Sequence, residues 1–176
     1  MAENRIIEAE DIRVFWDFSE NIDTSKIDAS ILRAQQTDLE PILGNPLYYE
    51  FIEDYNGTTF DTAKYKTLYD GEAYTYNGQS IYFRGVKQLL CVLSYIRLVE
   101  VSRINIVRSG EVFKVSEESE FAEDFQMRAD LAKAKTDAIR LEKEVLQYLS
   151  YKPADYPLFS YREYKEPKTS YKFYKI

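Results

Sequence analysis

The segment VKQLLCVLSYIRLVEVSRI, residues 86–104, decides the fold. Apolar side chains fall on nearly all sides of a helix formed by it, and such a helix belongs at the buried centre of a domain. The charged residues Lys87, Arg97, Glu100 and Arg103 exclude a membrane-spanning helix. The segment therefore predicts a mainly α fold, a helical bundle arranged around this buried central helix.

A second long helix is predicted at about residues 117–149, where Ser116 caps the start and acidic residues crowd the first turns. Apolar residues then repeat at alternating spacings of four and three: Met127, Leu131, Ala134, Ala138, Leu141, Val145 and Tyr148. This spacing is typical of close antiparallel packing, and two alanines allow near approach. The buried helix is the simplest partner, because a coiled coil with another chain would need more heptads.

One or two small β-hairpins are also expected. Residues 73–76 and 79–83 are rich in β-prone side chains and flank Asn77-Gly78, the strongest short hairpin signal. A second pair of β-prone runs lies at residues 104–107 and 112–115.

The N-terminal third is predicted to hold a short strand at 14–18 followed by helices. Asp28 is expected to cap the first helix, with Ile27 and Leu32 packing across the cap as a hydrophobic staple. A second helix is expected to begin at Asn45-Pro46 and a third to span about residues 61–69.

The composition excludes several classes of active site. The chain has no histidine, which removes histidine-based triads and histidine metal ligands. Its single cysteine, Cys91, cannot form a disulfide within the chain, and the apolar run around it favours a buried small side chain over a reactive thiol. These features describe a protein that is not an enzyme better than they describe an enzyme.

Motifs for cofactors and metals are missing as well. The six glycines form neither a dinucleotide-binding fingerprint nor a P-loop. Residues 54–57 begin like a calcium loop but lack its later ligands, so a helix stop is the better interpretation. The acidic run 117–124 is explained by the start of a capped helix. We therefore expect no cofactor, no metal and no catalytic residues.

Charge is distributed unevenly along the chain. The net charge is −7, and residues 151–176 hold six Lys or Arg against three Asp or Glu, which leaves −10 on the first 150 residues. An acidic body argues against a dedicated nucleic-acid binder, which needs clustered Lys and Arg. No apolar run is long enough for a membrane span, and the first residues have no signal-peptide core. We expect a protein of the cytoplasm or of a particle assembled there.

The C-terminal part has a different character. We expect a helical domain at 1–150 and an extended, aromatic and basic tail at 151–176. Aromatic residues form 15% of the chain, and excess tyrosine is common at interfaces, although codon bias or a tyrosine-decorated surface is the alternative. The expected partner-binding residues in the tail are Tyr161, Tyr164, Tyr171, Phe173 and Tyr174. Residues 169–174 are β-prone and suited to adding a strand to a sheet, for which a predicted hairpin could offer the edge.

Several segments, in their order along the chain, resemble the head–tail connector (adaptor) proteins of tailed bacteriophages over roughly residues 5–160. The segments are Asp23–Asp28, Ile31–Gln35, Asp38–Gly44, Leu47-Tyr48, Phe83–Lys87, Gly110–Val112, Val145–Leu149 and Asp155–Leu158. The tail from Ser160 onward has no counterpart in the resemblance.

The resemblance implies a structural virion protein of the neck. Such a protein assembles as a ring, commonly twelvefold, beneath the portal protein and bridges the capsid to further neck and tail proteins. DNA is then only cargo that passes through the lumen, and no membrane is involved. The alternative is a cytosolic helical regulator or binding module that acts through its aromatic tail.

Overall fold

The computed structural model describes residues 5–16, 22–108 and 117–159, with the side chains of 102–108 and 117–127 excepted. The elements are α1 (Ala9–Arg13), α2 (Thr24–Ala34), the π-helical segment η1 (Gln35–Leu39), α3 (Glu40–Leu43), α4 (Asn45–Glu53), α5 (Ala63–Asp70), β1 (Glu72–Tyr76), β2 (Gln79–Phe83), α6 (Gly85–Arg108) and α7 (Glu117–Tyr151). The described fold is mainly helical with a small antiparallel hairpin, which confirms the predicted fold class.

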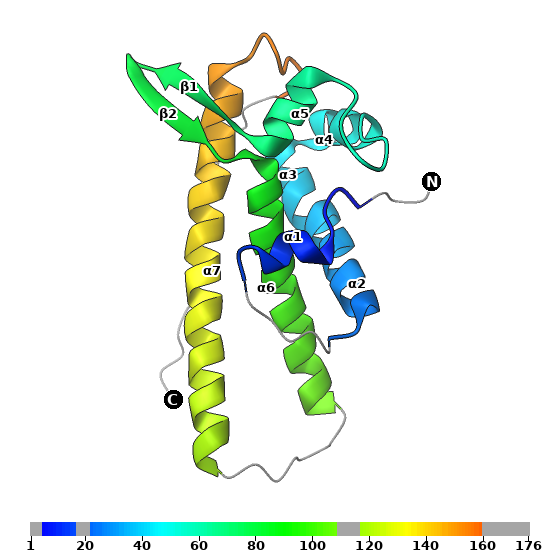
Figure 1. The fold of residues 1–176 in the computed structure, drawn as a ribbon, viewed down its shortest axis with the longest axis vertical. Coiled ribbons are helices and arrows are strands. Elements are labelled where there is room, and N and C mark those ends of the chain that lie inside the picture. The colour runs from blue at the N-terminus through cyan, green and yellow to red at the C-terminus, as the bar shows by residue number, and fades with distance from the viewer. Residues whose placement is uncertain (1–4, 17–21, 109–116, 160–176) are drawn as a thin grey trace, which may run out of the picture.

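Helix α6 is the centre of the molecule, as its sequence predicts. It lies between α7 on one side and α2 on the other, and α1 crosses it at mid-height (Figure 1). Its buried residues point in several directions around the helix: Val86, Leu89, Leu90, Cys91, Val92, Tyr95, Ile96 and Leu98. Because neighbours cover it from more than one side, the helix needs apolar residues on more than one face.

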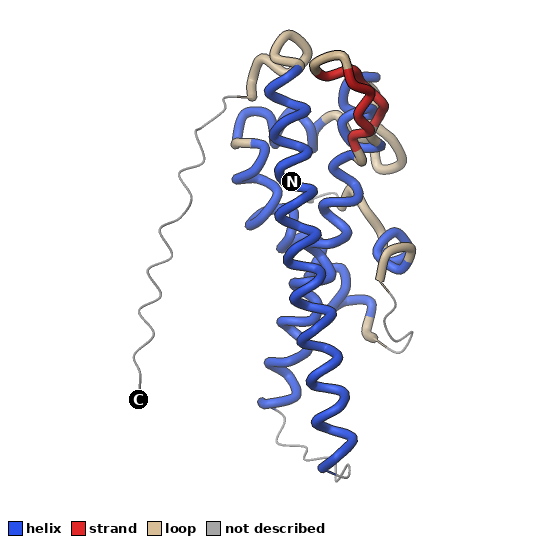
Figure 2. The backbone as a smooth tube through the Cα atoms, turned by 90° about the vertical axis from the view of Figure 1, so that its left-hand side faces the viewer, coloured by secondary structure: helices blue, strands red, loops and turns tan. Residues whose placement is uncertain are grey.

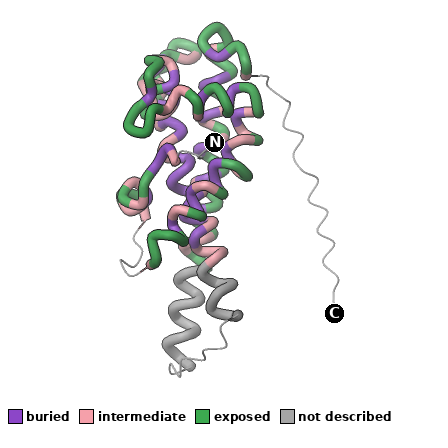
Figure 3. Tube along the Cα trace, turned by 90° about the vertical axis from the view of Figure 1, so that its right-hand side faces the viewer, coloured by how far each residue is buried: buried purple, intermediate pink, exposed green. Residues whose placement is uncertain are grey.

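Helix α7 packs antiparallel to α6 through the predicted seam (Figure 1). Ala134, Ala138, Leu141, Val145 and Tyr148 are all buried, and Leu131 is partly buried at the rim of the core. The side chain of Met127 lies outside the described residues. Figure 3 shows the buried positions concentrated where the helices face one another.

The segment from α2 to α3 is one helical rod interrupted by the π turn η1. The amide oxygen of the buried Gln35 accepts a hydrogen bond from the backbone N–H of Ile6 at 3.0 Å. Asp38 accepts two hydrogen bonds from the Arg97 guanidinium of α6, at 2.8 and 2.5 Å. The π turn thus carries the polar side chains that tie the N-terminal segment and α6 to this rod.

The first predicted hairpin is confirmed. Strands β1 and β2 pair antiparallel from Glu72↔Phe83 to Tyr76↔Gln79, and Asn77 and Gly78 form the two-residue turn with φ of 51° and 78°. Positive φ at both central residues defines a type I′ turn, which the Asn-Gly sequence favours. The hairpin lies at the end of the molecule where α7 finishes (Figure 2).

Two glycines fix the base of the hairpin against the helices that flank it. Gly71 ends α5 with a φ of +90°, and Gly85 starts α6 with a φ of +83°. A Cβ atom on Gly71 would lie 2.2 Å from the carbonyl oxygen of Phe83, and one on Gly85 would lie 2.2 Å from that of Tyr69. The two backbones therefore meet at a distance that excludes any side chain at either position.

Helix α2, the helix predicted to begin at Asp28, begins earlier than predicted. Asp23 rather than Asp28 caps α2, because its carboxylate accepts a hydrogen bond from the Ser25 backbone N–H at 2.9 Å. Asp28 lies inside the helix and pairs with Arg5, and Ile27 is buried in the helix, so the predicted staple is wrong. Helices α4 and α5 begin within two residues of their predicted starts.

Both further strand predictions are wrong where the structure describes them. Val14 and Phe15 form a turn after α1 in place of the expected strand at 14–18, of which 17 and 18 lie outside the described residues. Helix α6 continues through Arg108, so 104–107 is helical, while 112–115 lies outside the described residues. The β-branched residues of 104–107 extend a helix already formed, because adding a residue to a helix is easier than starting a strand.

The packed body extends beyond residue 150, where the sequence placed the start of the tail. Tyr156 is 2% exposed, and its hydroxyl donates a hydrogen bond to the Lys64 carbonyl oxygen at 2.8 Å. Its ring also lies 6.0 Å from that of Tyr148. Tyr156 therefore anchors residues 152–159 to the packed body, and the tail that remains, 160–176, lies outside the described residues.

We predict that Ala138→Phe destabilises the protein by about 1–3 kcal/mol, because the ring would overpack the buried contact between α6 and α7. Ala132→Phe is the matched control, since Ala132 is exposed on the same helix. Urea unfolding followed by circular dichroism measures both. Equal stability of the two variants would contradict the packing of α7 described here.

We predict that Gly71→Ala costs more stability than Gly57→Ala. Both glycines have positive φ, but nothing lies within 4 Å of a Cβ at Gly57, so that change costs only the left-handed backbone strain of about 1–2 kcal/mol. At Gly71 the new Cβ also collides with the backbone of Phe83. Thermal unfolding of the two variants measures the difference, and similar melting temperatures would show that the hairpin base can shift.

Candidate functional site

The tail residues expected to bind a partner, Tyr161, Tyr164, Tyr171, Phe173 and Tyr174, lie outside the described residues. Candidate sites in the described part are therefore sought among its exposed apolar side chains. The large ones are Val14, Phe15, Tyr49, Tyr82, Ile139, Tyr151 and Leu158. Single exposed apolar residues are normal, so only those that gather with others define a surface. Two such surfaces stand out.

The first surface lies at the hairpin end, where tyrosines from β1 and α7 pack together. Tyr74 lies 5.4 Å from both Tyr148 and Tyr151, measured between ring centroids, and Tyr76 lies 5.5 Å from Tyr151. Phe83 stacks on Tyr148 at 4.1 Å with the rings nearly parallel. These contacts hold the inner face of the hairpin on the last turns of α7, and Tyr151 remains 45% exposed at their margin.

A polar network closes the base of this aromatic packing. The Tyr148 hydroxyl donates a hydrogen bond to Glu72 at 2.7 Å, and Lys152 forms an ion pair with the same carboxylate oxygen. Burial raises the pKa of Glu72, but the hydrogen bonds from Lys152 and Tyr148 outweigh it, so the pKa lies below its ordinary value. The network joins the first residue of β1 to the turn that follows α7.

The outer face of the hairpin is open. Ala73, Thr75, Ser80 and Tyr82 are exposed, and Tyr82 is 63% exposed. We call these four residues the hairpin outer face. Residues 73–83 include no charged side chain, although 30% of the chain is charged. Among the described residues, no backbone hydrogen bond joins either strand to a third segment.

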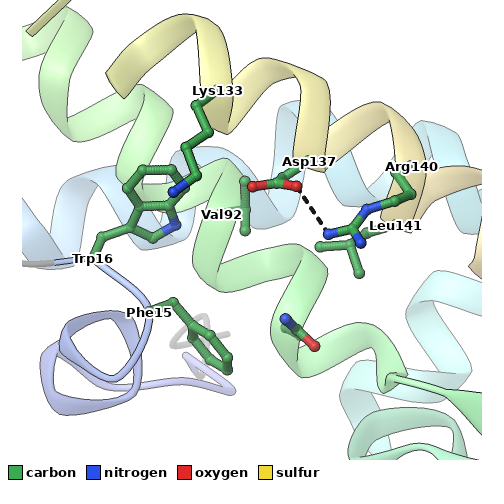
Figure 4. A pocket seen from close by; sticks show the side chains of 8 residues that line it. Phe15, Trp16, Val92, Lys133, Asp137, Arg140 and Leu141 are labelled. Carbon is green, nitrogen blue, oxygen red and sulfur yellow. Dashed lines mark hydrogen bonds and ion pairs between the residues drawn. The ribbon is translucent and has the colours of Figure 1, made fainter. Parts of the chain in front are cut away.

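The second surface is a groove beside Trp16, which we call the Trp16 groove (Figure 4). Its volume is about 110 Å³, and its lining residues are Phe15, Trp16, Gln88, Val92, Lys133, Asp137, Arg140 and Leu141. Trp16 stacks on Tyr95 of α6 at 4.6 Å, and the Lys133 ammonium lies 5.6 Å from the Trp16 ring centroid. Phe15 is 42% exposed and Val14 is 76% exposed at its margin.

The Trp16 groove suits a single side chain better than a cofactor. Pockets for drug-sized ligands occupy several hundred Å³, so this groove is too small to enclose one. Of its three charged residues, Arg140 donates to Asp137 at 2.8 Å, and Lys133 lies over the Trp16 ring (Figure 4). The groove therefore offers an apolar contact beside a rim that holds two cations and one anion.

Reactive groups within the described residues are few. No group of three or more Cys, Asp or Glu side chains there is arranged to hold a metal ion. Cys91 is buried in α6, and this burial raises the pKa of its thiol to about 12. None of the helices described has both the length and the apolar character needed to cross a membrane.

Neither surface is predicted as such by the sequence. The stacking of Trp16 on Tyr95 and the pairing of Lys152 with Glu72 join residues about 80 positions apart, and no local pattern encodes those contacts. The uncharged run 73–83 was the one available signal, because it is long for a chain this rich in charge.

Comparison with known proteins gives one match. The model of a family of unknown function, DUF6712, matches residues 39–169. This span includes α3, α4, α5, the hairpin, α6 and α7, and therefore the whole first surface. No curated protein and no solved structure gives a significant match.

We predict that Glu72→Gln lowers stability near neutral pH and that its effect fades in acid. A carboxylate whose folded pKa lies below its unfolded value stabilises the fold above the ordinary glutamate pKa, 4.5, and that stabilisation is lost as the pH falls through the folded value. Urea unfolding of wild type and variant between pH 7 and about pH 3 measures the difference in their free energies of unfolding. Glu53→Gln, on an exposed residue of α4, is the control for loss of one carboxylate. A difference that stays constant with pH would show that the ion pair of Lys152 with Glu72 does not stabilise the fold.

Proposed function

We propose that this chain, which belongs to the DUF6712 family of unknown function, is a structural head-to-tail connector of a tailed bacteriophage. In this proposal copies of the chain form a ring beneath the portal protein and bridge the capsid to the neck and tail. Its place is the neck of the virion, after synthesis in the host cytoplasm. The ordered resemblance of its segments to connector proteins is the starting point.

The observation that carries the proposal is that one subunit has two unlike exposed surfaces. The hairpin lies at one end of the molecule, while α1 crosses α6 at mid-height (Figure 1). Phe15 and Trp16, which line the groove, follow α1 within three residues. A twofold dimer needs one patch that fits itself, whereas a ring needs two different patches that meet head to tail. Two separate and unlike exposed surfaces on a modest domain suit the second arrangement.

The charge of the chain supports the same proposal. The first 150 residues carry −10, and a channel through which DNA passes should not hold phosphates tightly. We infer no cofactor and no catalytic step for this function, and the partners are the portal protein, other neck proteins and further copies of this chain.

We predict that the chain is present in purified virions and that mixing it with the cognate portal protein gives a ring-on-ring complex. Mass spectrometry of virions and electron microscopy of the mixture measure these outcomes. Phe15→Ser should reduce the yield of complexes, because it removes an exposed apolar contact, while Tyr49→Ser, at an exposed position of α4, should leave the yield unchanged.

Absence of the chain from virions would overturn the proposal. It would favour the alternative of a cytosolic regulator or binding module, which is expected to be found with a host or viral partner and not in the particle.

A further inference from the structure

We propose that the β1–β2 hairpin accepts residues 169–174 of a neighbouring copy as a third strand. This inference specifies how copies of the chain join, and in that respect it rests on the proposed function. The occupant is a segment of the chain outside the described residues, and the acceptor is fully described.

The hairpin lacks the features that normally protect a sheet edge. Natural edge strands carry charged side chains, prolines or bulges, or are covered by other elements. Residues 73–83 contain no charge and no proline, and the register runs without a bulge from Glu72↔Phe83 to Tyr76↔Gln79.

The register shows which backbone groups are free to pair. A two-residue turn makes Tyr76 and Gln79 a hydrogen-bonded pair, and such pairs alternate along an antiparallel ladder. The pairs Ala73↔Tyr82 and Thr75↔Ser80 are then the intervening ones, whose N–H and C=O groups point away from the hairpin. These residues are also the four that form the exposed hairpin outer face. Each edge therefore presents outward backbone groups on residues that are open to solvent.

The sequence of the tail fits this acceptor. Residues 169–174 read Thr-Ser-Tyr-Lys-Phe-Tyr, in which aromatic residues are favoured in strands and no proline interrupts the run. Residues 160–176 hold five Lys or Arg against two Glu, and this net charge of +3 complements the acidic body of another copy.

The tail also starts near the hairpin end of the subunit. Phe159 follows the buried Tyr156, which packs against the end of α7 beside the hairpin. The ten residues from 159 to 169 can span up to roughly 33 Å when extended. In this proposal that reach carries residues 169–174 from one subunit to the hairpin of the next.

A neighbouring copy is the acceptor we infer, and not the same chain. A ring needs a donor segment and an acceptor surface that differ, because each subunit must give one contact and receive another. A tail that folded back on its own hairpin would fill the edge and leave no such contact.

Disulfide trapping between two differently marked chains tests the proposal. One preparation carries Thr75→Cys or Ser80→Cys, one for each hairpin edge, and the other carries a cysteine at each of 170 to 173 in turn. The native Cys91 is buried and does not compete. We expect a disulfide between the two chains on mild oxidation of the mixture, because paired strands bring Cα atoms within the 4.4–6.8 Å that a disulfide spans.

Two controls keep this result specific. Ala132→Cys, exposed on α7, replaces the hairpin cysteine and should give only background cross-linking. Adding Pro at the other exposed position of the same edge, Ala73→Pro with Thr75→Cys or Tyr82→Pro with Ser80→Cys, removes one outward N–H and should abolish the disulfide without disturbing the β1–β2 ladder. The melting temperature of each variant verifies that it folds.

Failure of this inference can be told apart from failure of the proposed function. No disulfide in the mixture, or a disulfide formed only when both cysteines are in one chain, overturns the strand exchange even if the chain is found in virions. A disulfide in the mixture supports the exchange even if the chain is absent from virions, and in that case it is the connector function that fails.

Discussion

The burial of α6 between α7 and α2 is the constraint on which the rest of the structure depends. A helix with apolar residues on several faces is insoluble alone, so elements from both ends of the chain must cover it. The N-terminal rod from α2 to α3 covers one side and α7 covers the other. The position of the hairpin follows from this arrangement. Strand β1 starts directly after α5, strand β2 ends directly before α6, and the backbones of the two helix ends meet at Gly71 and Gly85.

Most of the fold could be predicted from local sequence signals, and the errors have physical causes. The apolar segment 86–104, the alanine-containing seam of α7 and the Asn77-Gly78 turn each point to one structure. The run 104–107 is equally β-prone, but it directly continues a formed helix, and cooperative extension overrode local preference. Asp23 and Asp28 both suit a cap, and in the structure Asp23 caps α2 while Asp28 lies inside the helix and pairs with Arg5.

The two surfaces were harder to predict because their contacts join residues far apart in the chain. Trp16 stacks on Tyr95, and Lys152 pairs with Glu72, only when the bundle brings these distant residues together. The aromatic residues after Leu149 show the limit of composition as a guide. Tyr156 reads as part of a tail, yet it is buried against Tyr148 and hydrogen-bonded to the backbone of α5.

The contact between Gly71 and Gly85 has a consequence for geometry beyond its effect on stability. Backbone meets backbone there, so the hairpin has little freedom to swing about its base and keeps a fixed direction relative to the axis of α6. Any strand that joined its edge would take up that direction. The direction of the hairpin would then set the angle between one subunit and the next. Two glycines that contact no partner would therefore determine that angle.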